Sequence, residues 1–220
     1  MRTLHDCYLY GIIDLGYVPR LGDCSCVAEQ MIEGGVDLIQ LRGKGKTIDQ
    51  LVDLAAGLHA ITSRSSIPLI VNDHAEIAGR VPVEGVHVGQ DDDPIEVARR
   101  KAGRTLLVGK STHSVEQARA AFGEGADYIG FGPIFATPTK PDYVPIGLSG
   151  IKQVHAEVNL PTFCIGGIKI DNLKDVIAAG ARRIAIVSGL LKASDIAAYA
   201  REAKRLLFDI KHQTSNPKHS

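Results

Sequence analysis

Two apolar runs in the first half of the chain end in acidic residues whose spacing suits a divalent cation. The run 69–71 is followed by Asn72 and Asp73, and the run 85–88 is followed shortly by Asp92. Strands joined by so short a crossover are typical parallel neighbours, so we expect both carboxylates at one rim. Mg²⁺ binds a few carboxylate oxygens and keeps water and phosphate oxygens as further ligands. The alternative is that Asp73 caps a helix and Asp92 is a surface loop charge, and this spacing alone leaves both interpretations open.

Amide, hydroxyl and cationic side chains follow other apolar runs in the same way. Arginine forks onto phosphate oxygens, and lysine adds a compact positive charge. We expect Arg42, Lys44, Lys140 and Ser111 to gather near the two carboxylates and hold a diphosphate, whose negative charge grows as its bond to carbon breaks. Lys140, Ser111 and Arg42 are therefore the catalytic candidates. The substrate-binding candidates at these points are Gln40, Arg42, Lys44, Asn72, Ser111, Thr137, Thr139 and Lys140.

The segment 137–145 around Lys140 contains three prolines and Tyr143. Such a loop can close over a substrate and exclude water, which would otherwise trap a cationic intermediate. The alternative is an ordinary surface loop with a solvated lysine, and the hydroxyls of Thr137 and Thr139 favour the first interpretation.

Two glycine-containing turns near the end of the chain indicate a second anion site. Gly166 and Gly167 follow the run 162–165, and Ser188 and Gly189 follow the run 184–187. Backbone N–H groups in such loops, together with a helix N-terminus, bind phosphate monoesters in many barrels. The alternative is that these glycines only make tight turns.

Two histidines require separate interpretations. His87 lies mid-strand between valines, which favours a hydrogen-bonded histidine in the barrel interior. His113 follows a strand end, so a proton-transfer role and a loop-orienting role in the first turn of the next helix are both open.

Short apolar runs alternate with amphipathic segments along the whole chain. Eight such units in about 200 residues predict a single α/β domain, a (β/α)₈ TIM barrel over residues 1–210, followed by a disordered tail at 211–220. An open doubly wound sheet is the alternative, but no glycine-rich dinucleotide motif follows the first strand. The expected strands are 8–13, 38–41, 69–71, 86–88, 106–108, 128–131, 162–165 and 184–187.

Composition limits the classes of partner. The 220 residues include 25 basic and 25 acidic side chains, so no net charge attracts nucleic acid or a membrane surface. No apolar run is long enough for a signal peptide or a membrane span, which predicts a cytoplasmic protein. The polar groups at the expected strand ends indicate small-molecule substrates that carry negative charge. The four cysteines show no disulfide framework, and a homo-oligomer is compatible with the sequence.

Taken together, the motifs at the expected strand ends resemble the thiamine-phosphate synthase family in order and spacing, over about residues 8–207. The resemblance implies a TIM barrel that joins a hydroxymethylpyrimidine diphosphate to a thiazole phosphate, or its carboxylate, by a dissociative substitution assisted by Mg²⁺. The motifs are QLRGK (40–44), VND (71–73), GVHVGQDD (85–92), GKSTH (109–113), ADYIGFGPIFATPTK (126–140), IGGI (165–168) and VS (187–188).

The same resemblance assigns roles to single positions. It makes Asp73 and Asp92 the Mg²⁺ ligands, and it assigns the pyrimidine diphosphate to Gln40, Arg42, Lys44, Asn72, Ser111 and Lys140. The thiazole phosphate is assigned to Thr137, Thr139, Gly167, Val187 and Ser188.

Two positions depart from the family pattern. Gly43 stands where the family usually has glutamate, and His74 stands where it often has arginine. A related group, the thiazole tautomerases, is similar in its glycine loops and its Ser-x-His stretch but generally lacks the second aspartate. Two alternatives therefore remain: an isomerase that uses His113, and a non-catalytic protein that binds thiamine precursors.

Overall fold

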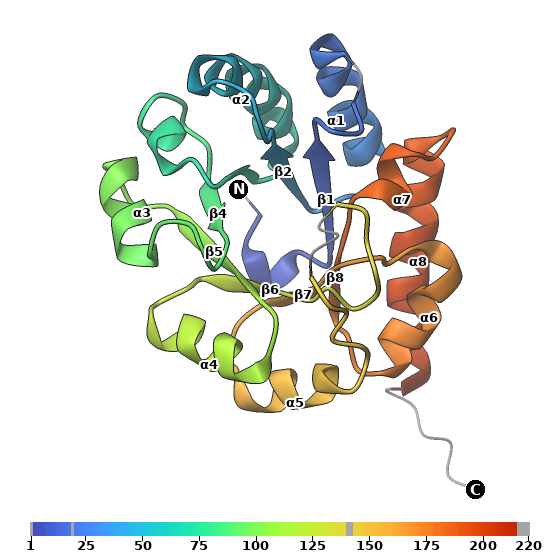
Figure 1. Ribbon diagram of the computed structural model, residues 1–220. Coiled ribbons are helices and arrows are strands. Elements are labelled where there is room, and N and C mark those ends of the chain that lie inside the picture. The colour runs from blue at the N-terminus through green and yellow to red at the C-terminus, as the bar shows by residue number, and fades with distance from the viewer. Residues whose placement is uncertain (1, 19, 140–142, 215–220) are drawn as a thin grey trace, which may run out of the picture.

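The computed structural model describes residues 2–18, 20–139 and 143–214. Its strands form a closed parallel barrel in which each strand pairs with the next and β8 pairs with β1 (Figure 1). The first and last strands pair in parallel, with Tyr10 opposite Ala185. This pairing closes the sheet, so the open doubly wound alternative is wrong. The strands are β1 (Leu9–Asp14), β2 (Leu38–Arg42), β3 (Leu69–Asn72), β4 (Gly85–Val88), β5 (Leu107–Thr112), β6 (Tyr128–Phe131), β7 (Thr162–Cys164) and β8 (Arg183–Ile186).

Helices cover the outside of the barrel and bury the outer face of the strands. The inner faces of the strands pack against one another inside the barrel. Most strand residues are therefore buried, and most of the strand sequence is apolar. The α-helices are α1 (Cys24–Glu33), α2 (Ile48–Thr62), α3 (Ile95–Ala102), α4 (Val115–Gly123), α5 (Gly150–Glu157), α6 (Ile170–Ala178), α7 (Ser188–Leu191) and α8 (Ile196–Thr214). Short 3₁₀ helices are η1 (Leu4–Asp6), η2 (Leu21–Asp23), η3 (Ser63–Ser65) and η4 (Ala75–Gly79).

The connection between β3 and β4 is the short one that the sequence predicts. It contains only η4, whereas α2 before it runs for 15 residues from a capping box formed by Thr47 and Gln50. The short crossover keeps the ends of β3 and β4 adjacent, with Asn72 paired to His87. It therefore sets the spacing between the acidic residues that follow these strands.

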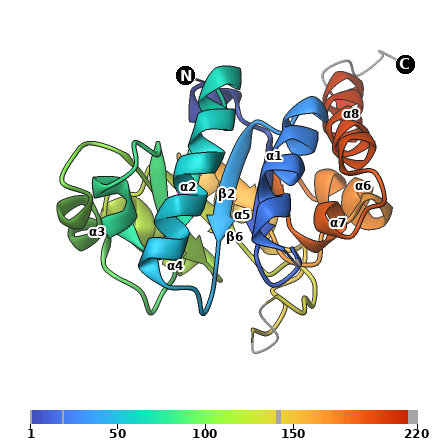
Figure 2. The same ribbon diagram turned by 90° about the horizontal axis from the view of Figure 1, so that it is seen from above.

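The last helix is longer than the sequence predicts. It continues through Thr214 into the segment expected to be a disordered tail, because no glycine or proline interrupts the chain before Pro217. Residues 215–220 lie outside the described residues. The end of α8 and the N-terminal segment lie at the opposite end of the barrel from the loop that follows β6 (Figure 2).

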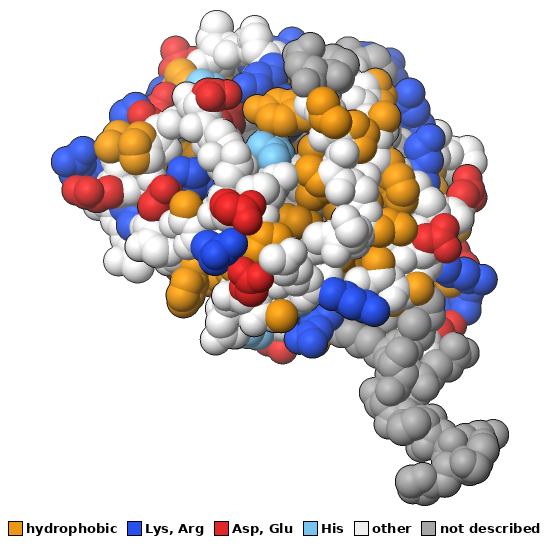
Figure 3. All heavy atoms as spheres, turned by 60° about the horizontal axis from the view of Figure 1, so that its bottom comes forward, with side chains coloured by type: hydrophobic (Ala, Val, Ile, Leu, Met, Phe, Trp, Pro, Cys, Tyr) orange, Lys and Arg blue, Asp and Glu red, His pale blue; other side chains and the backbone are white. Residues whose placement is uncertain are grey.

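No helix among the described residues is long and apolar enough to cross a membrane. Acidic and basic side chains are interspersed on the face shown in Figure 3, beside an area of apolar and uncharged groups. All four cysteines are free thiols, as expected.

Candidate active site at the carboxyl ends of the strands

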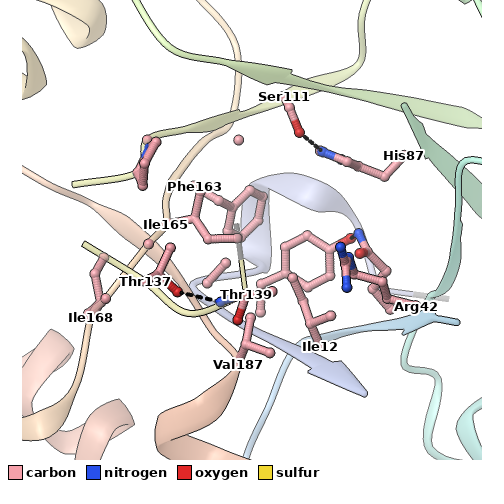
Figure 4. Close-up of a pocket in the computed structure, with 18 of the residues that line it drawn as sticks. Ile12, Arg42, His87, Ser111, Thr137, Thr139, Phe163, Ile165, Ile168 and Val187 are labelled. Carbon is pink, nitrogen blue, oxygen red and sulfur yellow. Dashed lines mark hydrogen bonds between the residues drawn. The ribbon is translucent and has the colours of Figure 1, made fainter. Parts of the chain in front are cut away.

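Two hollows adjoin at the carboxyl ends of the strands. The acidic pocket is lined by Arg42, Lys44, Asn72, Asp73, Gly89, Gln90, Asp91, Asp92, Ser111, Thr139 and Tyr143. The inner pocket reaches into the barrel, where Ile12, Phe163 and Ile165 form apolar walls (Figure 4). Because Arg42, Asn72, Ser111 and Thr139 line both hollows, a ligand could extend from one into the other.

The carboxylates of Asp73 and Asp92 face each other in the acidic pocket. Burial, and then the hydrogen-bonding proximity of Asp92, raises the pKa of Asp73, while the Lys44 ammonium lowers it. The Lys44 Nζ atom lies 2.9 Å from Oδ2 of Asp73. Asp92 is held by the backbone N–H of Gly89, which donates to its Oδ2 at 2.6 Å. The predicted convergence of the two acids at one rim is therefore observed.

Asp91 also lines the pocket, but the described ranges contain no group of three acidic, histidine or cysteine side chains that could hold a metal ion. Mg²⁺ commonly takes one or two carboxylates and fills its remaining positions with water and substrate phosphate oxygens. The donor set at Asp73 and Asp92 therefore fits Mg²⁺ bound together with a phosphorylated ligand better than it fits a closed structural site.

Arg42 is held in place by an acidic residue that the sequence reasoning did not select. Its Nη1 atom donates to Oδ2 of Asp14 at 2.6 Å, and the two side chains are only 13% and 5% exposed. Oδ1 of Asp14 accepts a second hydrogen bond from the N–H of Gly16 at 2.9 Å. Asp14 ends β1, so the rule that placed Asp73 and Asp92 at strand ends would also have found it.

His87 lies inside the barrel, as predicted. Its Nε2 atom is 3.0 Å from Oγ of Ser111, and its Nδ1 atom is 3.2 Å from the hydroxyl of Tyr128. Ser111 is thereby placed on the boundary between the two pockets, with a buried partner behind it.

His113 precedes helix α4 rather than forming its first turn. Its backbone N–H donates to Oε1 of Gln117 at 2.7 Å, and its Nδ1 atom is hydrogen bonded to the carbonyl of Gly132. Its ring packs on Tyr143, with 4.4 Å between ring centroids. These contacts place His113 on the wall of the inner pocket and tie it to the loops after β5 and β6.

The segment after β6 reaches across to the β1 side of the barrel. The hydroxyl of Thr139 is 3.2 Å from that of Tyr17, and its N–H donates to Oγ1 of Thr137 at 3.3 Å. Thr137 and Thr139 both face the inner pocket (Figure 4). The predicted catalytic residue Lys140 lies outside the described residues, as do positions 141 and 142.

The glycine turn after β7 has a structural reason as well as a candidate binding role. Gly166 and Gly167 have φ angles of +99° and +65°, and a side chain on Gly166 would meet Pro133 at 2.4 Å. Asn172 at the start of α6 donates to the carbonyl of Gly167 at 3.0 Å. The turn lies beside Val187 and Ser188 in the lining of the inner pocket.

The structure thus brings together the predicted binding residues that it describes. Sequence reasoning missed Asp14, Tyr17 and the buried phenols Tyr10 and Tyr128, all of which lie around the same pockets. The tyrosines gave no signal in the sequence because an aromatic residue in or next to a strand is ordinarily a packing residue.

The chain is similar to known proteins over most of its length. The chain is 44% identical over 203 residues to the thiamine-phosphate synthase of Chloroflexus aurantiacus, covering 92% of this chain and 93% of that protein. It is 43% identical over 194 residues to the thiamine-phosphate synthase of Halalkalibacterium halodurans, covering 88% and 92% of the two chains. The structure of thiamine phosphate pyrophosphorylase from Pyrococcus furiosus aligns with a TM-score of 0.85 at 31% identity, covering 94% of this chain and 98% of that one.

The sequence profile of the TMP-TENI family, described as thiamine monophosphate synthase, matches residues 9–190. This match spans the barrel from β1 to α7 and includes every described residue of the two pockets. The chain belongs to the thiamine monophosphate synthase family.

Proposed function

We propose that the protein is a thiamine-phosphate synthase. It would transfer a (4-amino-2-methylpyrimidin-5-yl)methyl group from its diphosphate to the ring nitrogen of a thiazole phosphate and release diphosphate. If the acceptor is the carboxylated thiazole phosphate, CO₂ would be released as well. The observation that carries the proposal is the acidic pocket, where Asp73 and Asp92 lie beside Arg42 and Lys44 and open onto an apolar inner pocket. A charged leaving group and two uncharged rings require this division of the site.

Asp73 and Asp92 would hold Mg²⁺ through their carboxylate oxygens. The bound ion would neutralise charge on the diphosphate as it leaves. Without a cation, burial and mutual proximity disfavour two ionised carboxylates at this place, as the raised pKa of Asp73 indicates. The pair is therefore suited to a cation.

Arg42, Lys44 and Ser111 would bind the diphosphate oxygens. As the carbon–oxygen bond breaks, its electron pair leaves with the diphosphate, and donors already aimed at those oxygens stabilise the growing charge. Arg42 is suited to this role because Asp14 fixes its guanidinium before substrate arrives. Lys140 is proposed to add a further positive charge from the loop after β6.

The inner pocket would hold the two rings and keep water away from the cationic pyrimidine carbon. Phe163, Ile165 and Ile12 supply apolar walls, and Gln40 and Asn72 supply amide groups for the pyrimidine. The thiazole nitrogen then forms the new carbon–nitrogen bond and becomes quaternary. With the plain thiazole phosphate no proton is transferred in this step, so that reaction needs no general base at His113. The carboxylated thiazole would in addition lose CO₂ and take up a proton at the ring carbon that carried the carboxylate.

The thiazole phosphate would lie against the turns after β7 and β8, with Gly167, Val187 and Ser188 on one side and Thr137 and Thr139 on the other. Helix α7 is a single turn beginning at Ser188, so individual N–H groups rather than a large helix dipole would bind the anion. A cytoplasmic location, where phosphorylated precursors are available, is part of this proposal.

The decisive experiment incubates purified protein with both substrates and measures thiamine phosphate and diphosphate, with Mg²⁺ and with EDTA. We expect equal amounts of the two products, formed only with Mg²⁺ and only when both substrates are present. Activity on a thiazole phosphate alone that survives EDTA and is lost in His113→Ala would instead identify the isomerase. Tight binding of both substrates without turnover would identify a binding protein.

A further inference from the structure

A continuous chain of hydrogen bonds crosses the barrel interior from Gln40 to Ser111. Nε2 of Gln40 donates to the hydroxyl of Tyr10 at 2.6 Å, and that hydroxyl is 3.1 Å from the hydroxyl of Tyr128. The Tyr128 hydroxyl is 3.2 Å from Nδ1 of His87, and Nε2 of His87 is 3.0 Å from Oγ of Ser111. Figure 4 shows the last of these contacts at the edge of the pocket. Both ends of the chain line the inner pocket, and its middle is buried.

The packing of the barrel is arranged around these rings. Tyr128 lies so close to the backbone of β5 that a side chain at Gly109 would meet its ring at 2.1 Å. Phe163 packs edge-on against Tyr10 and Tyr128, with centroid distances of 5.2 Å and 5.8 Å. The phenols therefore cannot turn away from each other without disrupting the core.

The donors and acceptors in the chain fix the direction of its protons. Burial raises the pKa of Tyr10 and of Tyr128 above the ordinary value, so both stay neutral and each has one hydroxyl proton. Because Gln40 donates to Tyr10, the Tyr10 proton has the Tyr128 oxygen as its acceptor among the described residues. A buried hydroxyl proton without an acceptor loses its hydrogen bonds to water and gains nothing in return, so the arrangement with an acceptor is favoured.

The direction of donation continues through Tyr128 and His87 to Ser111. Tyr128 donates its proton to Nδ1 of His87, so that nitrogen is unprotonated and Nε2 carries the hydrogen. Nε2 of His87 then donates to Oγ of Ser111. The Ser111 hydroxyl has its own proton left over, and this proton is available to an acceptor in the two pockets that Ser111 lines.

We propose that Tyr128 and His87 are positioning residues that hold the Ser111 hydroxyl as a hydrogen-bond donor toward an anion in the acidic pocket. The proposal deepens the proposed function, on which it rests for the identity of the anion, a diphosphate group. A reversed chain would make Ser111 donate to His87 and present only lone pairs to the anion, which would repel it. The direction of the chain therefore decides whether Ser111 attracts or repels the ligand.

The first test measures the tautomer of His87 and needs no substrate. Nitrogen-15 NMR of the full-length protein at neutral pH, assigned with a His87→Gln variant, should show His87 neutral and protonated on Nε2. In Tyr128→Phe, which removes the donor to Nδ1, the signal should shift toward the other tautomer. A His87 protonated on Nδ1 in the unaltered protein would overturn the proposal, whatever the enzyme's activity.

The second test is a double-mutant cycle with inorganic diphosphate and Mg²⁺, measured by calorimetry. Tyr128→Phe should weaken diphosphate binding roughly tenfold, the equivalent of losing one well-oriented hydrogen bond to an anion. In a Ser111→Ala background the same change should have almost no further effect, because its action passes through Ser111. Tyr8→Phe, which removes a phenol hydroxyl away from the pockets, should leave binding unchanged in both backgrounds.

Equal effects of Tyr128→Phe with and without Ser111 would show a general packing role and overturn the proposal. Unchanged diphosphate binding in Tyr128→Phe would also overturn the proposal. These outcomes are independent of the proposed reaction: failure to make thiamine phosphate would refute the synthase, while the tautomer and the cycle would still decide the role of Tyr128 and His87.

Discussion

Asp14 and Arg42 form a nearly buried ion pair at the mouth of the barrel, with 2.6 Å between Oδ2 and Nη1. The pair joins the ends of β1 and β2, which are adjacent in the sheet. One side of the guanidinium is thus fixed by protein, while Arg42 also lines both pockets.

Replacing Asp14 should therefore impair the binding of the diphosphate substrate. In Asp14→Asn the amide keeps the shape but loses the charge, so Arg42 is less well oriented, and we expect KM for the pyrimidine diphosphate to rise roughly tenfold. Steady-state kinetics would measure this, with Asp49→Asn as the matched control, because Asp49 pairs with Arg80 at 2.7 Å on the exposed surface. An unchanged KM in Asp14→Asn would show that Arg42 needs no such support.

Replacing Asp92 should reduce both turnover and the affinity for Mg²⁺. With one carboxylate removed, charge on the departing diphosphate is less well neutralised, and we expect kcat to fall by about 10²–10³-fold. A titration of activity against Mg²⁺ should also show a higher half-saturating concentration. Asp93→Asn is the control, since Asp93 pairs with Lys101 outside the pocket. Equal Mg²⁺ dependence in Asp92→Asn and the unaltered protein would exclude Asp92 as a ligand.

Introducing at position 43 the glutamate that the sequence resemblance leads us to expect there should destabilise this protein. A Cβ atom at Gly43 would lie 2.5 Å from Cδ2 of Leu51 and 2.9 Å from Cδ1 of Leu15. Because Leu51 is buried, we expect Gly43→Ala and Gly43→Glu to lower the free energy of unfolding by about 1–3 kcal/mol each. Urea unfolding of both variants separates the steric effect, common to the two, from any effect of the carboxylate. A Gly43→Glu variant that is as stable as the unaltered protein and turns over faster would show that the glycine is a functional defect.

His155 should make the protein less stable in mild acid. Burial, followed by the positive charges of Arg182 and Arg183, lowers the pKa of His155 to about 4 from an ordinary value of 6.5. The unfolded chain therefore binds more protons between these values, and stability present above pH 6.5 is lost as pH falls toward 4.

We expect this group to account for about 1 kcal/mol of the free energy of unfolding lost between roughly pH 7 and 5, after allowance for its partial exposure. Urea unfolding at the two pH values should show a smaller loss in His155→Gln, whereas His5→Gln, at an exposed site, should behave like the unaltered protein. An identical pH dependence in His155→Gln would assign the acid sensitivity to other groups.

The sequence by itself determined the barrel and the positions of its working residues along the chain. Eight apolar runs predicted the eight strands, with ends displaced by only a few residues, because strands buried on both faces are mostly apolar. The residues that follow the strands of a parallel barrel meet at one end of the barrel. The sequence alone therefore predicted that Asp73, Asp92 and Arg42 lie close together.

Only the tertiary structure decided which of these residues touch and what supports them. The ion pair of Asp14 with Arg42 joins positions 28 residues apart, and the contact of Tyr10 with Tyr128 joins positions 118 apart. Such partners are chosen by strand register and by side-chain packing across a closed barrel, and neither leaves a local pattern in the chain. The local sequence around a strand tyrosine does not show whether its hydroxyl has only a packing role or, through a histidine, orients a serine in the site.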